Sequence, residues 1–561
     1  MKKHLNLAFI ILTTATIICC SSKKEEMEKE FKQYISYYES KVIPLSKRTN
    51  LAWWEAATTG KDSAYALAQE LQVELTKFFS DSTEFAKVKH IKESGLINDS
   101  IEKRQIDVIY LSFLSSQADT ALLNQLIAMQ TDIEKKYSNF RADVDGKKVS
   151  DNDIEEILSN SSNSKELETA WLAHKQIGSL VASDIKALVQ KRNELAHSLG
   201  FDNYHTMSLQ FSEQDPIEIE RIFDELDNLT REAFADQKKD IDIYLAKRLN
   251  IKESELRPWH YQNRFFQEAP KIYNVKLDSY YEKQDIEKLT KTFYNGIGIG
   301  IDDILANSDL YERTGKNQHA FCIDIDNSGD IRVLCNVKSN QQWMNTMLHE
   351  FGHAAYDKYI DTTLPYSLRN PAHIFTTEAI AMLFGRFASN PQWIADNTGI
   401  SEAEKNTIAD DCNKSLRLEQ LVFSRWVQVM YRFEKSMYAN PDQDLNALWW
   451  QLVEIYQLIK KPEGRDAPDW ASKIHIATSP CYYHNYLLGE LLASQLHYYI
   501  TTNILKTEEK SMVSYSNMPA VGEYLKEKVF KPGALLEWNV MIERATGEKL
   551  TSKYYALQFV K

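Results

Sequence analysis

The feature that most constrains the fold of this 561-residue chain is its scarcity of residues that break helices. It contains only 18 glycines and 13 prolines, whereas average usage would make them roughly 12% of a chain. So few breakers favour long helices and exclude collagen-like, propeller and many-turned β architectures. An apolar fraction of 43% supplies a large core, which excludes a disordered chain. The chain is therefore expected to be mainly α.

Apolar residues recur at helical spacing over residues 28–140, 167–197 and 217–249. Further helices are expected at about 341–360, 371–389, 402–438 and 443–460, and from about Tyr482. Polar stretches around Asp145-Gly146 and residues 159–164 are interpreted as surface loops. Only residues 319–337 give a clear strand signal, because two apolar runs flank a turn at Asp326–Asp330. These patterns predict a helical body with one small antiparallel β element.

The N-terminus has the pattern of an export signal. A short basic region, Met1–His4, precedes an apolar run, Leu5–Ile18, that is too short to span a bilayer stably. The stretch Ile17-Ile18-Cys19-Cys20 resembles a bacterial lipobox, with cleavage before Cys20 and lipid on its thiol, although Cys19 stands where a small residue is usual. We expect a lipoprotein signal peptide at 1–19, a tether at 20–30 and one domain at 31–561.

This leader predicts an exported protein that is lipid-anchored to the bacterial outer membrane, on its periplasmic face or at the cell surface. Ser21 after Cys20 is not the aspartate associated with retention in the inner membrane. An exported soluble protein that is cut nearby is the alternative. No later stretch reaches 18 apolar residues, so no transmembrane helix is expected in the mature body. With 79 acidic and 66 basic side chains, the chain lacks the basic surface that nucleic-acid binding requires.

Export permits disulfides, and two cysteines flank the predicted turn. If the hairpin is centred between Ser328 and Gly329, Cys322 and Cys335 face each other across the strands. A cross-strand disulfide is then expected, with two small core thiols as the alternative.

The residues that indicate chemistry are His349-Glu350-Phe351-Gly352-His353. Residues four apart on a helix differ by about 40° in rotation, so both imidazoles can bind one zinc ion. Glu350 can then reach a water on the metal instead of the metal itself. A third protein ligand is needed, and Glu378 fits, because a lone carboxylate in its apolar stretch would be costly to bury. His373 is a competing third ligand.

These residues, with several other segments, make the chain similar to the angiotensin-converting-enzyme-like peptidyl-dipeptidases. That family consists of zinc peptidases with a nearly all-helical ellipsoid fold, two cleft-forming subdomains and a deep central cleft. The resemblance covers roughly residues 30–545. The further matching segments are Asn193–Ala196, Phe201–Tyr204, His319-Ala320, the hairpin with Cys335, Leu448–Trp450 and Lys473–Ile476.

The resemblance implies one zinc ion per chain, held by His349, His353 and Glu378, with Glu350 as general base and later general acid. His319, Ala320 and His475 would bind the substrate backbone. Tyr486 would donate to the oxyanion of the tetrahedral intermediate. Gln262, Lys473 and Tyr483 would bind the terminal carboxylate of the substrate.

Three positions depart from the family pattern. Val453 and Asn485 stand where chloride-activated members have arginines, so the resemblance does not imply a chloride requirement. Met382 replaces an acid that commonly follows the glutamate ligand by four positions, which alters the groups that orient a histidine. The tyrosine pair matches Tyr483 and Tyr486 if one residue is inserted; without the insertion it becomes Tyr482 and Asn485.

The predicted function is zinc-dependent release of C-terminal dipeptides from short peptides by a monomer. Two alternatives remain open. One is an endo-acting oligopeptidase of the thimet type, which shares the two histidines and the later glutamate. The other is a surface lipoprotein that binds peptides and has lost catalysis, although an intact Glu350 argues against it.

Overall fold

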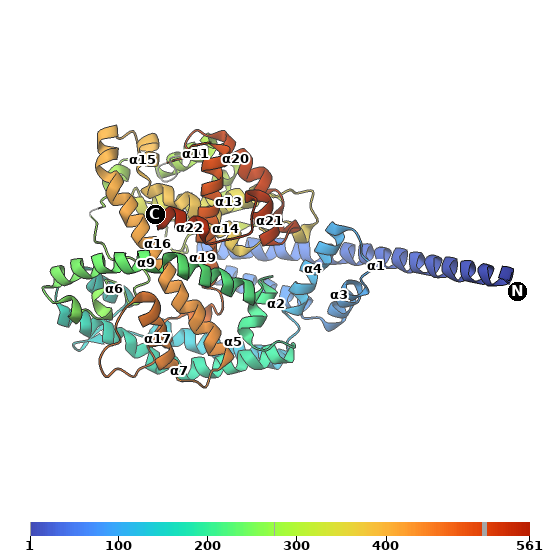
Figure 1. The fold of residues 1–561 in the computed structure, drawn as a ribbon, viewed down its shortest axis with the longest axis horizontal. Helices are drawn as coiled ribbons and strands as arrows, with labels where there is room; N and C mark the ends of the chain where they lie inside the picture. The colour runs from blue at the N-terminus through green and yellow to red at the C-terminus, as the bar shows by residue number, and fades with distance from the viewer. Residues whose placement is uncertain (1, 274, 508–512, 561) are drawn as a thin grey trace.

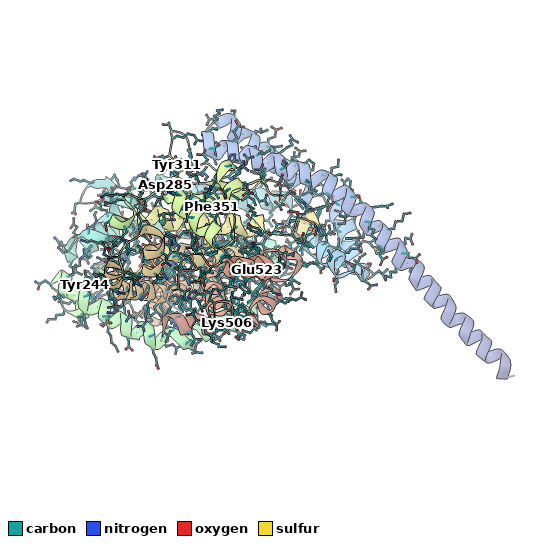
Figure 2. The ribbon with its side chains drawn as sticks, turned by 90° about the horizontal axis from the view of Figure 1, so that it is seen from above. Tyr244, Asp285, Tyr311, Phe351, Lys506 and Glu523 are labelled. Carbon is teal, nitrogen blue, oxygen red and sulfur yellow. The ribbon has the colours of Figure 1, made fainter. Side chains whose placement is uncertain are left out.

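A helix that projects from the body begins the chain in the computed structural model, which describes residues 2–273, 275–507 and 513–560, with side chains from residue 23 onward. This helix, α1, runs Lys2–Thr59 and extends away from the other helices in both views (Figures 1 and 2). Its second half packs on α2 (Asp62–Phe79), and α3 (Ser82–Ser94) and α4 (Ser100–Leu114) lie beside it. Buried aromatic and aliphatic side chains, among them Phe31, Tyr38 and Phe113, give this group a small core of its own.

Two predictions concern the N-terminal leader. The predicted lipidation site, Cys20, lies outside the residues whose side chains are described. Among the described residues, no helix has both the length and the apolar character that crossing a membrane requires.

The rest of the chain forms two groups of helices that meet along a central layer (Figure 1). One group contains α5 (Thr120–Asn139), α6 (Asp151–Asn160), α7 (Ser164–Ser198) and α17 (Leu445–Gln457). The short helices α8 (Tyr204–Phe211) and α18 (His475–Thr478) pack on α7. The other contains α10 (Asp278–Tyr281), α11 (Ile286–Gly296), α12 (Asp302–Asn307), α13 (Gln341–Lys358), α14 (Ile374–Gly385), α15 (Pro391–Thr398), α20 (Pro519–Leu525) and α21 (Trp538–Thr546). Between them lie the longer helices α9 (Pro216–Leu249), α16 (Glu402–Ala439) and α19 (His484–Tyr499), together with the short helix α22 (Lys553–Phe559).

One large apolar core joins both groups, and it includes the fully buried Trp171, Trp393 and Trp426. Helix α14 packs on α13 and on α19, so it lies at the junction of the groups. The expected mainly α fold is confirmed: among the described residues, only two short antiparallel strand pairs interrupt the helices.

The hairpin beside α13 consists of β3 (Phe321–Asp324) and β4 (Ile331–Leu334). Its register differs from the prediction, because Cys322 lies opposite Val333 and Cys335 lies beyond the strand end. Both thiols are free, so the predicted disulfide between them is wrong. Diagonal neighbours on a sheet have Cα atoms about 7–8 Å apart, which is too far for a disulfide.

Side-chain hydrogen bonds in the turn set this register. The Asp324 carboxylate accepts from the backbone N–H of Asp326 at 3.1 Å and of Asn327 at 2.8 Å. Asn327 has a φ of 50°, the left-handed conformation that Asn tolerates better than most residues. The turn is therefore centred between Asn327 and Ser328, one residue earlier than predicted.

A second strand pair was not predicted. Strands β1 (Ala142–Val144) and β2 (Lys147–Val149) are joined by Asp145 and Gly146, with φ values of 51° and 82°. Two consecutive residues in this conformation form the tight turn that Asp-Gly favours between strands. The sequence prediction interpreted this segment as a surface loop, because each strand has only three residues.

Candidate metal centre and substrate cleft

Helix α13 carries the two histidines and packs unusually close to α14. The Asn340 side chain caps its first turn by accepting from the backbone N–H of Trp343 at 2.9 Å. A Cβ atom on Gly352 would lie 2.8 Å from Cα of Ala381 in α14, well inside ordinary contact. Since only glycine permits this approach, Gly352 lets α14 bring Glu378 up to the two histidines.

Three ligand atoms converge at this contact. His349 Nε2 and His353 Nε2 are 3.3 Å apart. Glu378 Oε2 lies 3.7 Å from the first and 3.8 Å from the second. A point equidistant from the three atoms is about 2.1 Å from each, which is the length of zinc–nitrogen and zinc–oxygen bonds. In the described part of the chain, this is the one group of side chains close enough to hold a metal ion, and its geometry fits zinc.

Burial keeps both imidazoles in the form that binds metal. Burial lowers the pKa of His349 to about 4, and burial with the neighbouring His349 lowers the pKa of His353 to about 3. Both rings are therefore neutral at physiological pH, as a metal ligand must be. Burial raises the pKa of Glu378 to about 7, and a bound cation would favour its ionised form.

A hydroxyl orients the second histidine. Thr377 Oγ1 lies 2.8 Å from His353 Nδ1, so the Nε2 atom of that ring faces Glu378. Met382 packs where α19 approaches α14, since a Cβ on Gly489 would lie 3.2 Å from its sulfur. The neutral Thr377 thus occupies the orienting position on His353, and the sequence analysis did not identify this role.

His373 is the N-cap of α14. Its Nδ1 accepts from the backbone N–H of Phe375 at 3.2 Å, and its ring packs on Phe375 and Trp538. The competing third ligand is therefore used in helix capping, and the structure brings Glu378 to the histidines instead.

Glu350 lies beside the ligand atoms and is only 9% exposed. Burial and the nearby Glu378 carboxylate raise its pKa to about 8. A carboxylate whose pKa lies near neutrality is suited to accept and return a proton.

A cavity of about 570 Å³ opens over these residues. Its lining includes His349, Glu350, His353, Thr377 and Glu378 on the α13–α14 side, and Ala320, Phe321, Cys322, Ile323 and Asp324 of the hairpin segment. Ala320 is thus placed in the same cavity as the metal ligands. His319 is exposed and is not part of the lining.

Lys473 lies in the opposite group of helices, in an aromatic cage. Its Nζ is 5.3 Å from the ring centroids of Phe265, Trp426 and Tyr483. It donates to Gln267 Oε1 at 2.5 Å. Burial and then the Arg264 charge lower its pKa to about 7. A buried ammonium beside an amide and a tyrosine is suited to bind a carboxylate.

Gln262 does not join this cage, contrary to the prediction. Its Nε2 donates to Ser159 O at 3.0 Å, and its Oε1 accepts from the backbone N–H of Lys271 at 2.9 Å. A φ of 59° at Gln262 turns the chain there. The glutamine beside Lys473 is Gln267, which the sequence analysis missed.

The predicted tyrosines and His475 form one aromatic group. The Tyr483 ring lies 5.2 Å from His475 and 5.4 Å from Tyr486. Burial and the Glu378 carboxylate raise the pKa of Tyr486, which places Tyr486 near the metal ligands. The Nδ1 atom of His475 is buried, with no hydrogen-bond partner among the described residues.

The alternative alignment placed Asn485 in the cleft, but Asn485 is buried and accepts from Gln214 Nε2 at 2.8 Å. The pair that faces the other site residues is therefore Tyr483 and Tyr486. Tyr482 also lies near Glu378, whose charge, after burial, raises its pKa.

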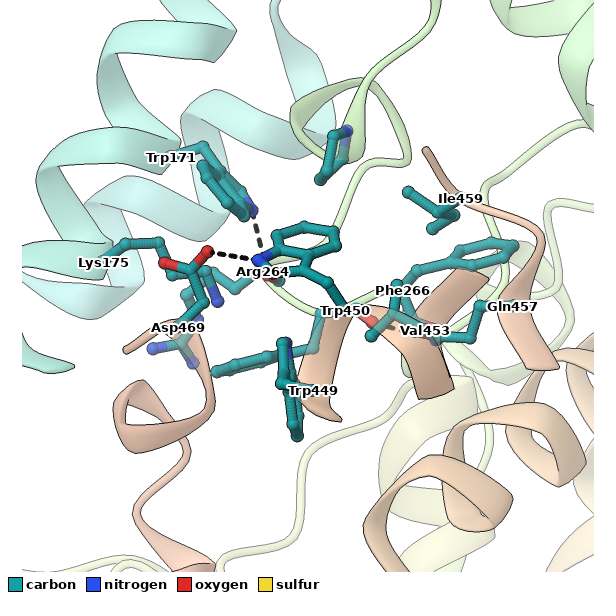
Figure 3. A pocket seen from close by; sticks show the side chains of 12 residues that line it. Trp171, Lys175, Arg264, Phe266, Trp449, Trp450, Val453, Gln457, Ile459 and Asp469 are labelled. Carbon is teal, nitrogen blue, oxygen red and sulfur yellow. Dashed lines mark hydrogen bonds between the residues drawn. The ribbon is translucent and has the colours of Figure 1, made fainter. Parts of the chain in front are cut away.

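Val453, the other position that departs from the chloride-binding pattern, lines a separate, water-sized cavity of about 20 Å³ (Figure 3). Two hydrogen bonds cross it, from Trp171 Nε1 to Arg264 O and from Trp450 Nε1 to Asp469 Oδ2, both 3.1 Å. The Arg264 guanidinium pairs with acids of α6, and Asp469 pairs with Arg465.

Comparison with known proteins agrees with this arrangement. The family model described as angiotensin-converting enzyme matches residues 25–254 and 270–561. An angiotensin-converting enzyme of Theromyzon tessulatum is 22% identical over 94% of this chain and 90% of its own length. One of Haematobia irritans exigua is 20% identical over 92% and 90%. Carboxypeptidase 1 of Bacillus subtilis (strain 168) is 26% identical over 43% of this chain and 52% of its own length. The chain therefore belongs to the angiotensin-converting enzyme family of metallopeptidases.

Proposed function

We propose that this protein is a zinc-dependent peptidyl-dipeptidase that hydrolyses short peptides. The observation that carries the proposal is the convergence of His349, His353 and Glu378 on a point about 2.1 Å from each ligand atom, with Glu350 beside them. A zinc ion at that point would polarise the peptide carbonyl and lower the pKa of a water molecule.

Glu350 acts as the general base and then as the general acid. Its position in the cavity lets it accept the proton of the attacking water and return that proton to the departing amine. Without a cation nearby, the pKa of Glu350 is about 8. A divalent ion beside this carboxylate would lower that pKa.

The other predicted residues bind the substrate. Tyr486, close to Glu378, donates its hydroxyl to the oxyanion. Ala320 contributes main-chain contacts from the hairpin segment. His475 and His319 bind the peptide backbone, and His319, which is exposed, reaches it only if the cleft closes on the substrate.

The anchor for the C-terminus is Lys473, with Gln267 and Tyr483. The ammonium has no acidic ion-pair partner within 4 Å among the described residues, and its hydrogen bond goes to the neutral Gln267. A free carboxylate would supply the missing charge. Held there, the last two residues of a peptide would leave as a dipeptide.

Product analysis tests the proposal. A decapeptide with a free C-terminus is incubated with the purified protein, with and without a zinc chelator, and the products are identified by mass spectrometry. Chelator-sensitive release of C-terminal dipeptides is expected. Release of single C-terminal residues, or internal cuts of the thimet type, would overturn the dipeptidase assignment. Zinc binding without cleavage would indicate a peptide-binding protein.

We also propose that the protein is an exported monomer, lipid-anchored through Cys20 to the bacterial outer membrane, and that it needs no chloride. The leader sequence supports the anchor, and Val453 and Asn485 support the lack of a chloride requirement. Metabolic labelling with a fatty acid should modify the wild type but not Cys20→Ser, and hydrolysis rates should not change between chloride and acetate buffers.

A further inference from the structure

The cavity over the metal ligands continues past them into an acidic end. Beyond the histidines, it is lined by Asp357 of α13 and by Cys322 and Asp324 of β3. Asp357 follows His353 by four residues and Glu350 by seven, so the three side chains share one face of the helix. The acidic end therefore adjoins the site of the proposed reaction.

The two aspartates face each other across the space between β3 and α13. In β3, Cys322 and Asp324 lie opposite Val333 and Ile331, both buried, on the face that packs toward α13. The Cys322 sulfur lies 3.9 Å from Asp357 Oδ2. Burial and then the Asp324 charge raise the pKa of Asp357 to about 8.

Among the described residues, no cationic side chain forms an ion pair with either aspartate. Lys47 and Arg332, which lie near the hairpin, pair with Asp326 at 2.9 Å and with Asp330 at 2.7 Å. Lys358, the residue after Asp357, pairs with Asp303 instead. In the described part of the chain, neither Asp324 nor Asp357 has an ion-pair partner within 4 Å.

Arg369 also lines the cavity, but its guanidinium is engaged elsewhere. Its Nε donates to Leu364 O at 2.8 Å and one terminal nitrogen donates to Ser328 Oγ at 3.1 Å. A metal ion is not the missing cation either, because the aspartates are not in the one ligand group that the described residues form. A cationic group of a bound peptide can supply the missing charge instead.

We propose that Asp357 and Asp324 form a subsite for a cationic group of the peptide on the N-terminal side of the cleaved bond. The cation is a lysine or arginine side chain, or the free α-amino group of a short peptide. The inference rests on the proposed function, and it names the class of peptide that this site prefers.

The position of the subsite follows from the two anchors. Lys473, which would hold the C-terminus, is not part of this cavity, so the acidic end is left for the preceding part of the peptide. Four residues of α13 rise about 6 Å from His353 to Asp357. An extended peptide covers that distance in about two residues, so the cation belongs to one of the two residues before the cleaved bond.

The test compares matched peptides that have lysine, norleucine or glutamate at these two positions, each with a free or an acetylated N-terminus. Norleucine keeps most of the length of lysine without its charge. For the wild type, kcat/KM should be about tenfold or more higher for lysine than for norleucine in the acetylated series, and lowest for glutamate. If the α-amino group is the cation, the preference should appear as faster cleavage of free over acetylated norleucine peptides.

Variants assign the preference to the aspartates. Asp357→Asn and Asp324→Asn should each reduce the preference for lysine over norleucine severalfold, with one zinc ion still bound. Asp303→Asn is the matched control, because it removes an exposed carboxylate of α12 that pairs with Lys358, the residue next to Asp357 in α13. It should keep the preference.

Equal kcat/KM for the acetylated lysine and norleucine peptides, together with no effect of acetylation, would overturn the subsite. So would a preference that survives in both aspartate variants. Dipeptide release from the norleucine peptides would, in that case, leave the proposed function intact, whereas a lack of dipeptide release from every peptide would contradict the proposed function itself.

Discussion

Replacing Gly352 by alanine tests whether the close contact of α13 and α14 sets the metal geometry. The added Cβ would lie 2.8 Å from Cα and 3.1 Å from N of Ala381, whereas ordinary contact begins at 3.4 Å. The helices must separate by about 0.6 Å, because both contacts are with backbone atoms that cannot turn away. If Glu378 moves with α14 by that amount, the point equidistant from the ligand atoms recedes to about 2.3–2.4 Å from each, beyond the normal zinc bond length.

The expected result is a loss of about tenfold or more in zinc affinity and about 1–3 kcal/mol in the free energy of unfolding, even though alanine favours a helix over glycine by about 1 kcal/mol. Zinc affinity is measured by competition with a chromophoric chelator, and stability by denaturant unfolding of the zinc-free protein. Gly385→Ala is the matched control, since a Cβ at this position in α14 would make an ordinary contact of 3.5 Å with Asn345. If Gly352→Ala bound zinc as tightly as this control, the close contact would not set the ligand geometry.

Three further predictions concern the surrounding residues. Thr377→Val should lower zinc affinity by about 10–100-fold, because His353 loses its hydrogen-bond partner at 2.8 Å, with little change in the free energy of unfolding. An unchanged affinity in the chelator assay would mean that packing alone orients the His353 ring. Gln267→Ala should raise KM for peptides with a free C-terminus at least severalfold, whereas Gln262→Ala should not, and the reverse pattern in steady-state kinetics would contradict the contact with Lys473. Since the pKa of Lys473 is lowered to about 7, its side chain is a charged ammonium below that pH. Above that pH it is a neutral amine, which must take up a proton before it can bind a carboxylate. The ratio of kcat/KM for free over amidated peptides should therefore fall by up to tenfold per pH unit above about 7, and a flat ratio between pH 6 and 9 would oppose the role of this lysine.

The helices and the metal ligands were predictable because their signals are local. Scarce glycine and proline and regular apolar spacing predicted α13 and α14 to within a few residues, and a four-residue spacing placed His349 and His353 on one face. Glu378 stood out as a single acid in an apolar segment.

Features that depend on contacts between distant segments were not predictable in the same way. Gln262 and Gln267 lie in an irregular stretch, where no periodicity indicates which side chain faces Lys473. The hairpin register depended on which backbone N–H groups Asp324 accepts from, and an error of one residue moved Cys322 away from Cys335. The contact of Thr377 with His353 and the lack of a cation beside Asp357 arise only when α13 meets α14 and β3.

The central claim is that this metal centre, with Glu350 as the base, hydrolyses peptides. It is tested most directly by measuring zinc content and hydrolysis rate together for the wild type and for Glu350→Gln. We expect one zinc ion per chain in both proteins and a rate about a hundredfold to ten-thousandfold lower in the variant, since proton transfer by a positioned carboxylate contributes about 10²–10⁴-fold. A zinc-loaded variant that hydrolyses peptides as fast as the wild type, or a wild type that remains fully active after its zinc is removed, would contradict the account.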